Sequence, residues 1–155
     1  SKAIWEANKL APPAGCFVGF ASNKTDIKGE PFHLNEFPPC ADGEVIHNHG
    51  FKELAYEGDK IPQVKIDDVV PDIGLIPTVL SMDCEGSDWE VLKGAEQTLR
   101  KYHPKLYVSW HPEFMFRMFD AYTGDARRWV RDLGYKETFL DYQHEVHMLY
   151  ENNNS

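Results

Sequence analysis

The fold of this chain is decided by the stretch Pro77-Thr-Val-Leu-Ser-Met-Asp-Cys-Glu-Gly-Ser-Asp-Trp-Glu-Val-Leu-Lys-Gly-Ala-Glu-Gln-Thr-Leu99. Val79–Met82 is a short apolar run between a proline and acidic residues, which is typical of a strand buried on both faces. Ser87 and Glu90 have the spacing of a capping box, so we expect a helix to begin there and to continue until Pro104 stops it. The stretch therefore predicts a buried strand followed by one helix.

A second strand is predicted at Lys105–Trp110, and polar residues follow it as they follow the first strand. Strand, helix and strand over about 35 residues form a βαβ crossover, whose two strands run parallel. In such sheets the ligand site lies beyond the carboxyl ends of the strands. We therefore expect Asp83 and Glu85, after the first strand, to share one rim with His111 and Glu113, after the second.

Residues 83–95 carry a resemblance to a known family. Their sequence, Asp-Cys-Glu-Gly-Ser-Asp-Trp-Glu-Val-Leu-Lys-Gly-Ala, resembles the D-x-E-G-x-E-x-x-V-L-x-G-A signature of the FkbM methyltransferases. Residues 65–69 resemble the T-L-D-x-L segment of that family, and residues 104–111 resemble its P-x-I-x-x-E-x-H strand. The order and spacing of the three segments match. Three positions depart from the family pattern, namely Asp88 and Ser109, where Glu is usual, and Ser81, where Lys is common.

The resemblance implies an α/β fold with the Rossmann-like sheet of class I methyltransferases. That sheet is mostly parallel and ends in an antiparallel hairpin near the carboxyl terminus. The glycine-rich D-x-G-x-N-x-G motif of the family does not occur in this sequence, so we expect it, and the first strands of the sheet, upstream of Ser1. We interpret residues 1–155 as one partial methyltransferase domain with a loop-rich insertion at residues 23–60.

The resemblance also implies S-adenosylmethionine as the cofactor. A strand is predicted at residues 16–21, and in the family the end of this strand approaches the adenine. Ala21 and Ser22 would therefore contact the cofactor, together with Asp83. The acceptor implied by the family is a small molecule.

Further helices and strands follow from the patterns elsewhere in the chain. Residues 1–10 and 126–133 are predicted helices, the second with Asp125 as its cap and Gly134 just past its end. A short strand is predicted within residues 64–70. Strands at residues 135–140 and 144–150 are expected to form the terminal hairpin, and residues 151–155 a frayed end.

Composition limits the classes of partner. The 155 residues suit one domain, and a hydrophobic fraction of 42% is enough to form a core. With 25 acidic and 16 basic residues the formal net charge is −9, and nucleic acids or anionic membranes are not expected as partners because both attract positive surfaces. No apolar run reaches about 18 residues, the length that spans a bilayer. Cys16, Cys40 and Cys84 show no C-x-x-C pairing, which favours a reducing compartment and predicts a cytoplasmic location.

Methyl transfer needs an aligned acceptor and a group that takes its proton. Asp83 is the first candidate, because the positive end of a helix dipole keeps a carboxylate ionised. His111 is the second, since an imidazole titrates near neutral pH. Glu85 and Glu113 are expected to orient the acceptor, or to bind a divalent cation together with Asp83 and His111. The preferred interpretation assigns catalysis to Asp83, His111 and Glu85 and includes no metal.

Substrate contacts are predicted at Trp110, Glu113 and Phe114, close to the second strand end. Residues 114–119 are dense in Phe and Met, and they either line a hydrophobic pocket or belong to the ordinary core. His47 and His49 form an H-x-H pair that suits a metal site or, alternatively, a polar loop.

Each site residue also has a structural interpretation. Asp83 and Glu85 would then only cap the helix, and His111 would be a satisfied structural histidine. Cys84 would be a small buried residue rather than a nucleophile.

Two functions of different classes are consistent with the sequence. The first is an S-adenosylmethionine-dependent methyltransferase that acts on a hydroxyl group of a small molecule or sugar. The second is a cofactor-free remnant of that fold, which serves as a binding or structural module. In this second case a second copy of the chain would cover the exposed sheet edge, whereas in the first case the missing amino-terminal part would pair with it. A metal hydrolase is less consistent, because no H-E-x-x-H or comparable spacing occurs.

Overall fold

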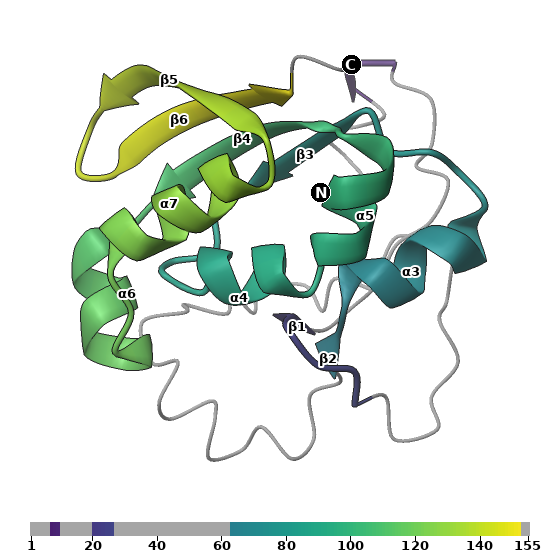
Figure 1. The fold of residues 1–155 in the computed structure, drawn as a ribbon, viewed down its shortest axis with the longest axis horizontal. Helices are drawn as coiled ribbons and strands as arrows, with labels where there is room; N and C mark the ends of the chain where they lie inside the picture. The colour runs from purple at the N-terminus through teal and green to yellow at the C-terminus, as the bar shows by residue number, and fades with distance from the viewer. Residues whose placement is uncertain (1–6, 10–19, 27–62, 153–155) are drawn as a thin grey trace.

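The computed structural model describes residues 7–9, 20–26 and 63–152, and they contain two sheets (Figure 1). The larger sheet has four strands in the order β3-β4-β6-β5. Its strands are β3 (Val79–Met82), β4 (Lys105–Trp110), β6 (Val146–Asn152) and β5 (Tyr135–Tyr142). The smaller sheet is a parallel pair formed by β1 (Phe20–Ala21) and β2 (Gln63–Val64).

The predicted βαβ crossover is confirmed. β3 and β4 are parallel neighbours, with Val79 opposite Lys105 and Met82 opposite Val108. The chain between them forms two helices rather than the single predicted one, α4 (Asp88–Lys93) and α5 (Glu96–Tyr102).

The break between α4 and α5 has a packing reason. A Cβ atom on Gly94 would lie 1.9 Å from the carbonyl oxygen of Ser22, so the backbone after β1 packs directly against this glycine. The new helix that starts at Glu96 is then capped from outside, because the Asp67 carboxylate accepts hydrogen bonds from the amides of Gln97 and Thr98 at 3.0 and 2.8 Å.

Asp67 belongs to α3 (Ile66–Ile73), which corrects the strand predicted within residues 64–70. The strand β2 covers only Gln63–Val64, and the helix begins two residues later. The first turn of α3 carries Asp67 and Asp68, and acidic side chains there interact favourably with the helix dipole. Gly74 ends the helix in the left-handed conformation at φ 67°.

The carboxyl-terminal third follows the predicted order, with some shifted boundaries. α6 (Pro112–Phe119) and α7 (Thr123–Asp132) precede the antiparallel hairpin of β5 and β6, which is confirmed. α7 begins before the predicted cap, so Asp125 lies in its first turn and pairs with Arg128 at 2.7 Å. Gly134 follows the helix with φ 92°, as expected. β6 extends to Asn152, so the predicted frayed end is wrong for residues 151–152.

The larger sheet is mixed rather than mostly parallel. β6 inserts beside β4 as an antiparallel neighbour, and β5 pairs with β6 in the same sense. Within this sheet only the β3–β4 pairing is therefore parallel.

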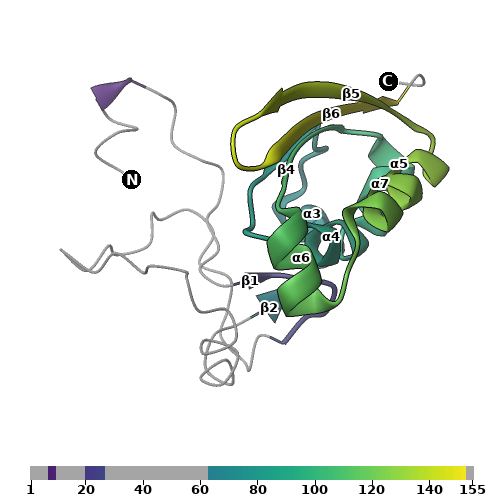
Figure 2. The same ribbon diagram turned by 90° about the vertical axis from the view of Figure 1, so that its left-hand side faces the viewer.

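Buried and more exposed side chains alternate along β4, and this pattern shows which face of the sheet forms the core. Leu106, Val108 and Trp110 are buried, whereas Tyr107 between them is exposed. The buried residues join one cluster with residues of α4, α5, α6 and α7, which lie together beneath one face of the sheet in Figure 2. β3 is an edge strand of the described sheet and Val79 is 49% exposed, so the prediction that this strand is buried on both faces is wrong.

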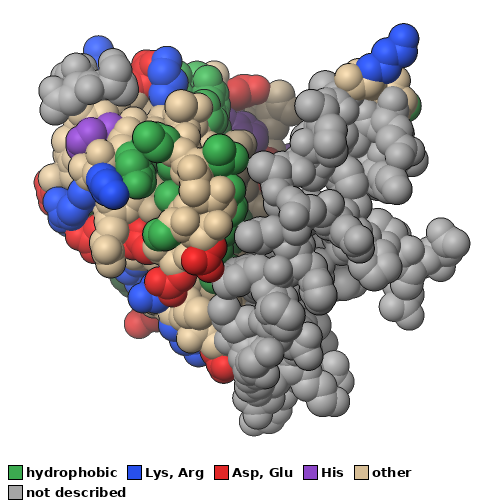
Figure 3. Space-filling model, turned by 90° about the vertical axis from the view of Figure 1, so that its right-hand side faces the viewer, with side chains coloured by type: hydrophobic (Ala, Val, Ile, Leu, Met, Phe, Trp, Pro, Cys, Tyr) green, Lys and Arg blue, Asp and Glu red, His purple; other side chains and the backbone are tan. Residues whose placement is uncertain are grey.

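The surface is mixed in character. On the described part of the face in Figure 3, acidic, basic and hydrophobic side chains are interspersed. Among the described residues, no helix has the length and apolar character needed to cross a membrane. Four predicted features lie wholly or mostly outside the described residues. They are most of the helix at residues 1–10, most of the strand at 16–21, the H-x-H pair and most of the insertion at 23–60.

Candidate functional site

The candidate site is built on the loop that joins β3 to α4. Two residues of this loop have positive φ angles, Glu85 at 50° and Gly86 at 98°. A Cβ atom on Gly86 would lie 2.7 Å from Cβ of Phe114 and 2.9 Å from the amide nitrogen of Met115. The glycine therefore allows the loop to turn and to lie directly against the start of α6.

Asp88 holds this loop from within. Its carboxylate is fully buried and accepts hydrogen bonds from the amides of Cys84 and Gly86 at 2.8 and 3.2 Å. Burial raises the pKa of the Asp88 carboxyl, and the amide of Cys84 and the nearby His111 oppose that effect. The predicted capping box is wrong, because Ser87 Oγ donates to the carbonyl of Cys84 and no side-chain hydrogen bond caps α4.

Glu90, the other half of that predicted box, has different partners. Its carboxylate accepts hydrogen bonds from Lys93 and Asn23. It therefore links α4 to the segment after β1.

His111 is the centre of the site. It follows β4 and precedes α6, where Pro112 occupies the first helical position. Its side chain is only 11% exposed. The ring stacks on Phe114, with centroids 5.9 Å apart and planes at 15°. The imidazole is thus held in one orientation by the end of a core strand and an adjacent aromatic ring.

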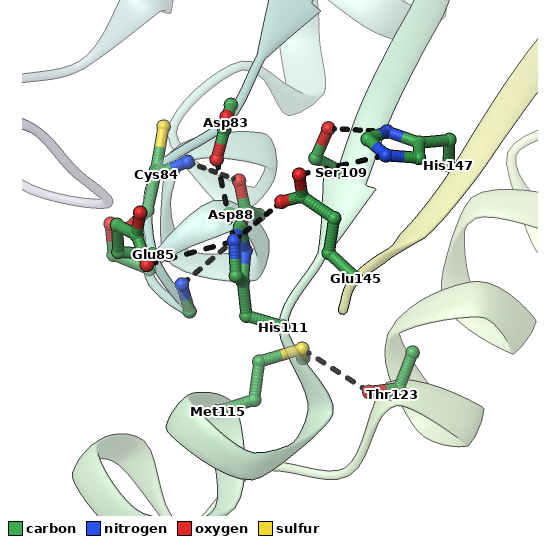
Figure 4. Close-up of polar contacts among 12 residues, drawn as sticks. Asp83, Cys84, Glu85, Asp88, Ser109, His111, Met115, Thr123, Glu145 and His147 are labelled. Carbon is green, nitrogen blue, oxygen red and sulfur yellow. Dashed lines mark hydrogen bonds and ion pairs between the residues drawn. The ribbon is translucent and has the colours of Figure 1, made fainter. Parts of the chain in front are cut away.

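Four carboxylates surround this imidazole (Figure 4). His111 Nε2 lies 2.6 Å from Glu145 Oε2, 3.4 Å from Asp83 Oδ1 and 3.6 Å from Glu85 Oε2. On the opposite side of the ring, Nδ1 lies 3.7 Å from Asp88 Oδ2. The predicted meeting of Asp83, Glu85 and His111 is therefore what the structure contains.

Glu145 is the member of the cluster that sequence reasoning missed. It lies in the connection between β5 and β6, and its second oxygen is 3.5 Å from Nε2 of His147. His147 in turn shares a 2.9 Å hydrogen bond with Ser109 Oγ. The predicted hairpin was the signal that could have found Glu145. A strand that runs antiparallel beside β4 begins at the carboxyl end of β4, so its first residues lie close to His111.

Two predicted substrate residues lie away from the cluster. Glu113 is exposed on α6 and pairs with Arg117 at 2.9 Å, so it does not share the rim with His111 as expected. The Trp110 side chain is fully buried and donates a 2.8 Å hydrogen bond to the hydroxyl of Tyr150. The structure therefore places neither of these side chains in the cluster around His111.

The other predicted residues have mixed environments. Phe114 is half-buried against His111, and Met115 is buried in the core. Ala21 and Ser22 lie at the end of β1, where the amide of Ser22 donates to the carbonyl of Val64 at 2.9 Å. Burial raises the pKa of the Cys84 thiol to about 12, so the thiol stays protonated at neutral pH and its structural interpretation is favoured.

A hollow of about 460 Å³ adjoins the cluster at Asp83. It lies over β3, β4, β6 and β5, and both polar and apolar side chains line it. The lining residues are Ser81, Met82, Asp83, Tyr107, Val108, Ser109, Leu140, His147 and Met148. A small molecule in this hollow would reach Asp83 at one side.

Together these features define an α/β protein with a polar site at the carboxyl ends of two adjacent parallel strands. The family model of the methyltransferase FkbM domain matches residues 8–137. The chain belongs to the FkbM methyltransferase family.

Among solved structures, the chain is similar to a methyltransferase FkbM from Methylobacillus flagellatus KT. The two are 22% identical with a TM-score of 0.44, over 58% of this chain and 23% of that one. The matched region thus covers less than a quarter of the length of that protein. No match was found among curated proteins.

Proposed function

We propose that the chain is part of an S-adenosylmethionine-dependent methyltransferase that modifies a hydroxyl group of a small molecule, including a sugar. Its family supports methyl transfer as the reaction. The observation that carries the proposal for this site is that Asp83 and His111 lie 3.4 Å apart, although they follow different parallel strands. They meet beside a hollow large enough for a small molecule.

The hollow supports a hydroxylated acceptor. Ser81, Asp83, Ser109 and His147 offer hydrogen-bonding groups, and Tyr107 offers an aromatic face. A few fixed polar groups among apolar walls are what orients a small ligand. An acceptor hydroxyl hydrogen-bonded to Asp83 would lie next to the whole carboxylate cluster.

The exposed carboxylates are the proposed proton acceptors. The side chains of Asp83 and Glu85 are 58% and 47% exposed, so both reach the space in front of the cluster. His111 Nε2 is 2.6 Å from Glu145 Oε2, so an acceptor hydroxyl would have to compete with Glu145 for this nitrogen. His111 is therefore better suited to hold the carboxylates in position than to take the proton itself.

The cofactor contacts remain part of the proposal. Ala21 is exposed and Ser22 is half-buried at the carboxyl end of β1, and these two residues are the proposed contacts of the adenine ring. When bound, S-adenosylmethionine supplies an electrophilic methyl group. Asp83 is the third proposed cofactor contact.

Calorimetry with S-adenosylhomocysteine, on the full gene product, tests the class of function. Saturable binding is expected, and ATP, which shares only the adenosine part, serves as the control ligand. Absence of binding by S-adenosylhomocysteine would favour the alternative of a cofactor-free binding or structural module.

Methyl transfer from labelled donor to a panel of hydroxylated small molecules tests the site. Asp83→Asn is expected to lower the rate by about 100-fold or more, which is the usual contribution of a proton acceptor. Asp125→Asn removes an exposed carboxylate paired with Arg128 on α7 and should leave the rate unchanged. Equal rates for both variants would reject Asp83 as a catalytic residue.

A further inference from the structure

We propose that Asp83, His111 and Glu145 bind a divalent transition-metal cation. Each offers one ligand atom, a carboxylate oxygen or the imidazole Nε2, and these atoms all lie within 4.8 Å of one another. Ligands that bind such a metal at about 2.1 Å are separated from each other by about 3 Å. The 3.4 Å separation of Nε2 from Asp83 meets this requirement, whereas the 2.6 Å separation from Glu145 would have to widen for a cation to enter between the two atoms.

The charge of the cluster favours a cation. Asp83, Glu85 and Glu145 converge on one side of the imidazole, with Asp88 on the other. In the part of the chain that the structure describes, neither lysine nor arginine forms an ion pair with any of these four carboxylates. Carboxylates this close repel each other, and a dication held between them removes that repulsion.

The environment of His111 is a second, independent observation. The imidazole is almost nine-tenths buried, and its Nδ1 is a buried atom without a hydrogen-bond partner among the described residues. A cation on Nε2 would fix the ring hydrogen on Nδ1, where it faces Asp88 Oδ2 at 3.7 Å. Metal-binding histidines usually have such a carboxylate behind the ring.

The ligand types indicate which metals fit. One imidazole and two carboxylates suit Zn²⁺, Mn²⁺ or Fe²⁺. Mg²⁺ prefers oxygen ligands and retains several water molecules, so it should bind this site more weakly. Mn²⁺ and Zn²⁺ are therefore the appropriate probes.

Metal binding itself does not depend on the proposed function. A role of the metal in methyl transfer, however, rests on the proposed function. A cation held by three protein ligands has open positions, and an acceptor oxygen bound there loses its proton more readily. Among the described residues, Glu85 pairs with His111 alone. With the metal in place, Glu85 would be the carboxylate that takes the acceptor proton.

Calorimetric titration of the metal-free protein with Mn²⁺ and with Zn²⁺ tests the inference. One site is expected. Asp83→Asn, His111→Gln and Glu145→Gln should each weaken binding at least tenfold, whereas Asp125→Asn should not change it. Glu85→Gln should bind the metal within about threefold of the original protein, because Glu85 is not a proposed ligand.

Two further measurements keep the outcomes separate. Circular dichroism and thermal unfolding without metal show whether a variant is folded. If His111→Gln fails to fold, Glu145→Gln still tests the site, because it alters only the connection between β5 and β6. Metal binding that is unchanged in Asp83→Asn and Glu145→Gln would be adventitious and would overturn the inference. Metal binding without S-adenosylhomocysteine binding would reject the proposed function but keep the metal site, and the reverse result would reject only the metal site.

Discussion

Gly86 shows how a single residue sets the geometry of the site. Its φ angle of 98° places it where residues with a side chain are strained, and Phe114 leaves no room for a Cβ atom. Both constraints act at the loop that carries Asp83 and Glu85. The position of these carboxylates relative to His111 therefore depends on the absence of a side chain at residue 86.

Gly86→Ala is expected to lower the free energy of unfolding by about 2 kcal/mol or more, because the strained backbone and the close contact act together. Chemical denaturation followed by circular dichroism measures the change. Gly124→Ala is the matched control, since a Cβ atom there has no neighbour within 4 Å and alanine favours the helix. Equal stability of the two variants would contradict the close packing of the loop on α6.

At the level of elements, a charged network ties α7 to β5. Glu137 on β5 accepts hydrogen bonds from Arg127 at 2.8 and 3.1 Å and from Arg131 at 3.0 Å. The hydrogen bonds from Arg127 are the main reason that the pKa of Glu137 lies below its ordinary value of 4.5. The carboxylate is only 21% exposed, so this network is better shielded from solvent than the other arginine pairs.

This shift predicts a dependence of stability on pH. A lowered pKa in the folded state contributes stability above the unfolded value of about 4.5, and this contribution is lost as the pH falls through the folded pKa. Glu137→Gln should cost about 1 kcal/mol at pH 7 and flatten the loss of stability below pH 4.5. Urea unfolding at several pH values measures both effects. Glu96→Gln, which breaks the more exposed pair with Arg100, should change neither by more than a few tenths of a kcal/mol.

At the scale of the whole molecule, Gly94 joins the two sheets. The Ser22 carbonyl, directly after β1, packs on this glycine between α4 and α5. The Gly94 carbonyl also accepts a 2.9 Å hydrogen bond from the amide of Asp67 in α3. The small sheet, which contains the proposed adenine contacts, is thus positioned against the crossover that carries the polar cluster.

Gly94→Ala should disturb this junction, because a Cβ atom would lie 1.9 Å from a backbone oxygen that belongs to another element. We expect faster hydrogen exchange at the amide of Ser22, which bonds to Val64, while amides of β4 keep their protection. Hydrogen exchange read by NMR distinguishes the two regions. Uniform protection in the variant would show that the sheets are joined elsewhere.

Local patterns were sufficient for several features of the fold and site. The apolar runs predicted β3 and β4, and their parallel pairing followed from the helical segment between them. Since polar residues follow both strands, the meeting of Asp83, Glu85 and His111 could be predicted as well. The hairpin of β5 and β6 was also predicted, from two strand-like runs that follow each other closely in the sequence.

Other features depended on contacts that no local pattern encodes. Ser87 and Glu90 have capping-box spacing, yet a buried carboxylate at Asp88 competes for the same loop and organises it instead. The crossover helix is divided because Ser22 approaches Gly94 and Asp67 caps the second half. The single helix was wrong because Ser22 and Asp67, which divide it, are distant in sequence. The capping box was wrong because Asp88, although adjacent to Ser87, is buried by the tertiary packing and bonds to the loop amides.

The sequence by itself determined the family, the parallel crossover and two of the strand ends that carry the site, because apolar spacing and turn residues act over short distances. Only the tertiary structure decided that the sheet is mixed and that Glu145 completes the cluster around His111. The physical reason is the position of β6, which pairs with β4 and so brings a distant carboxylate to the carboxyl end of the parallel strands.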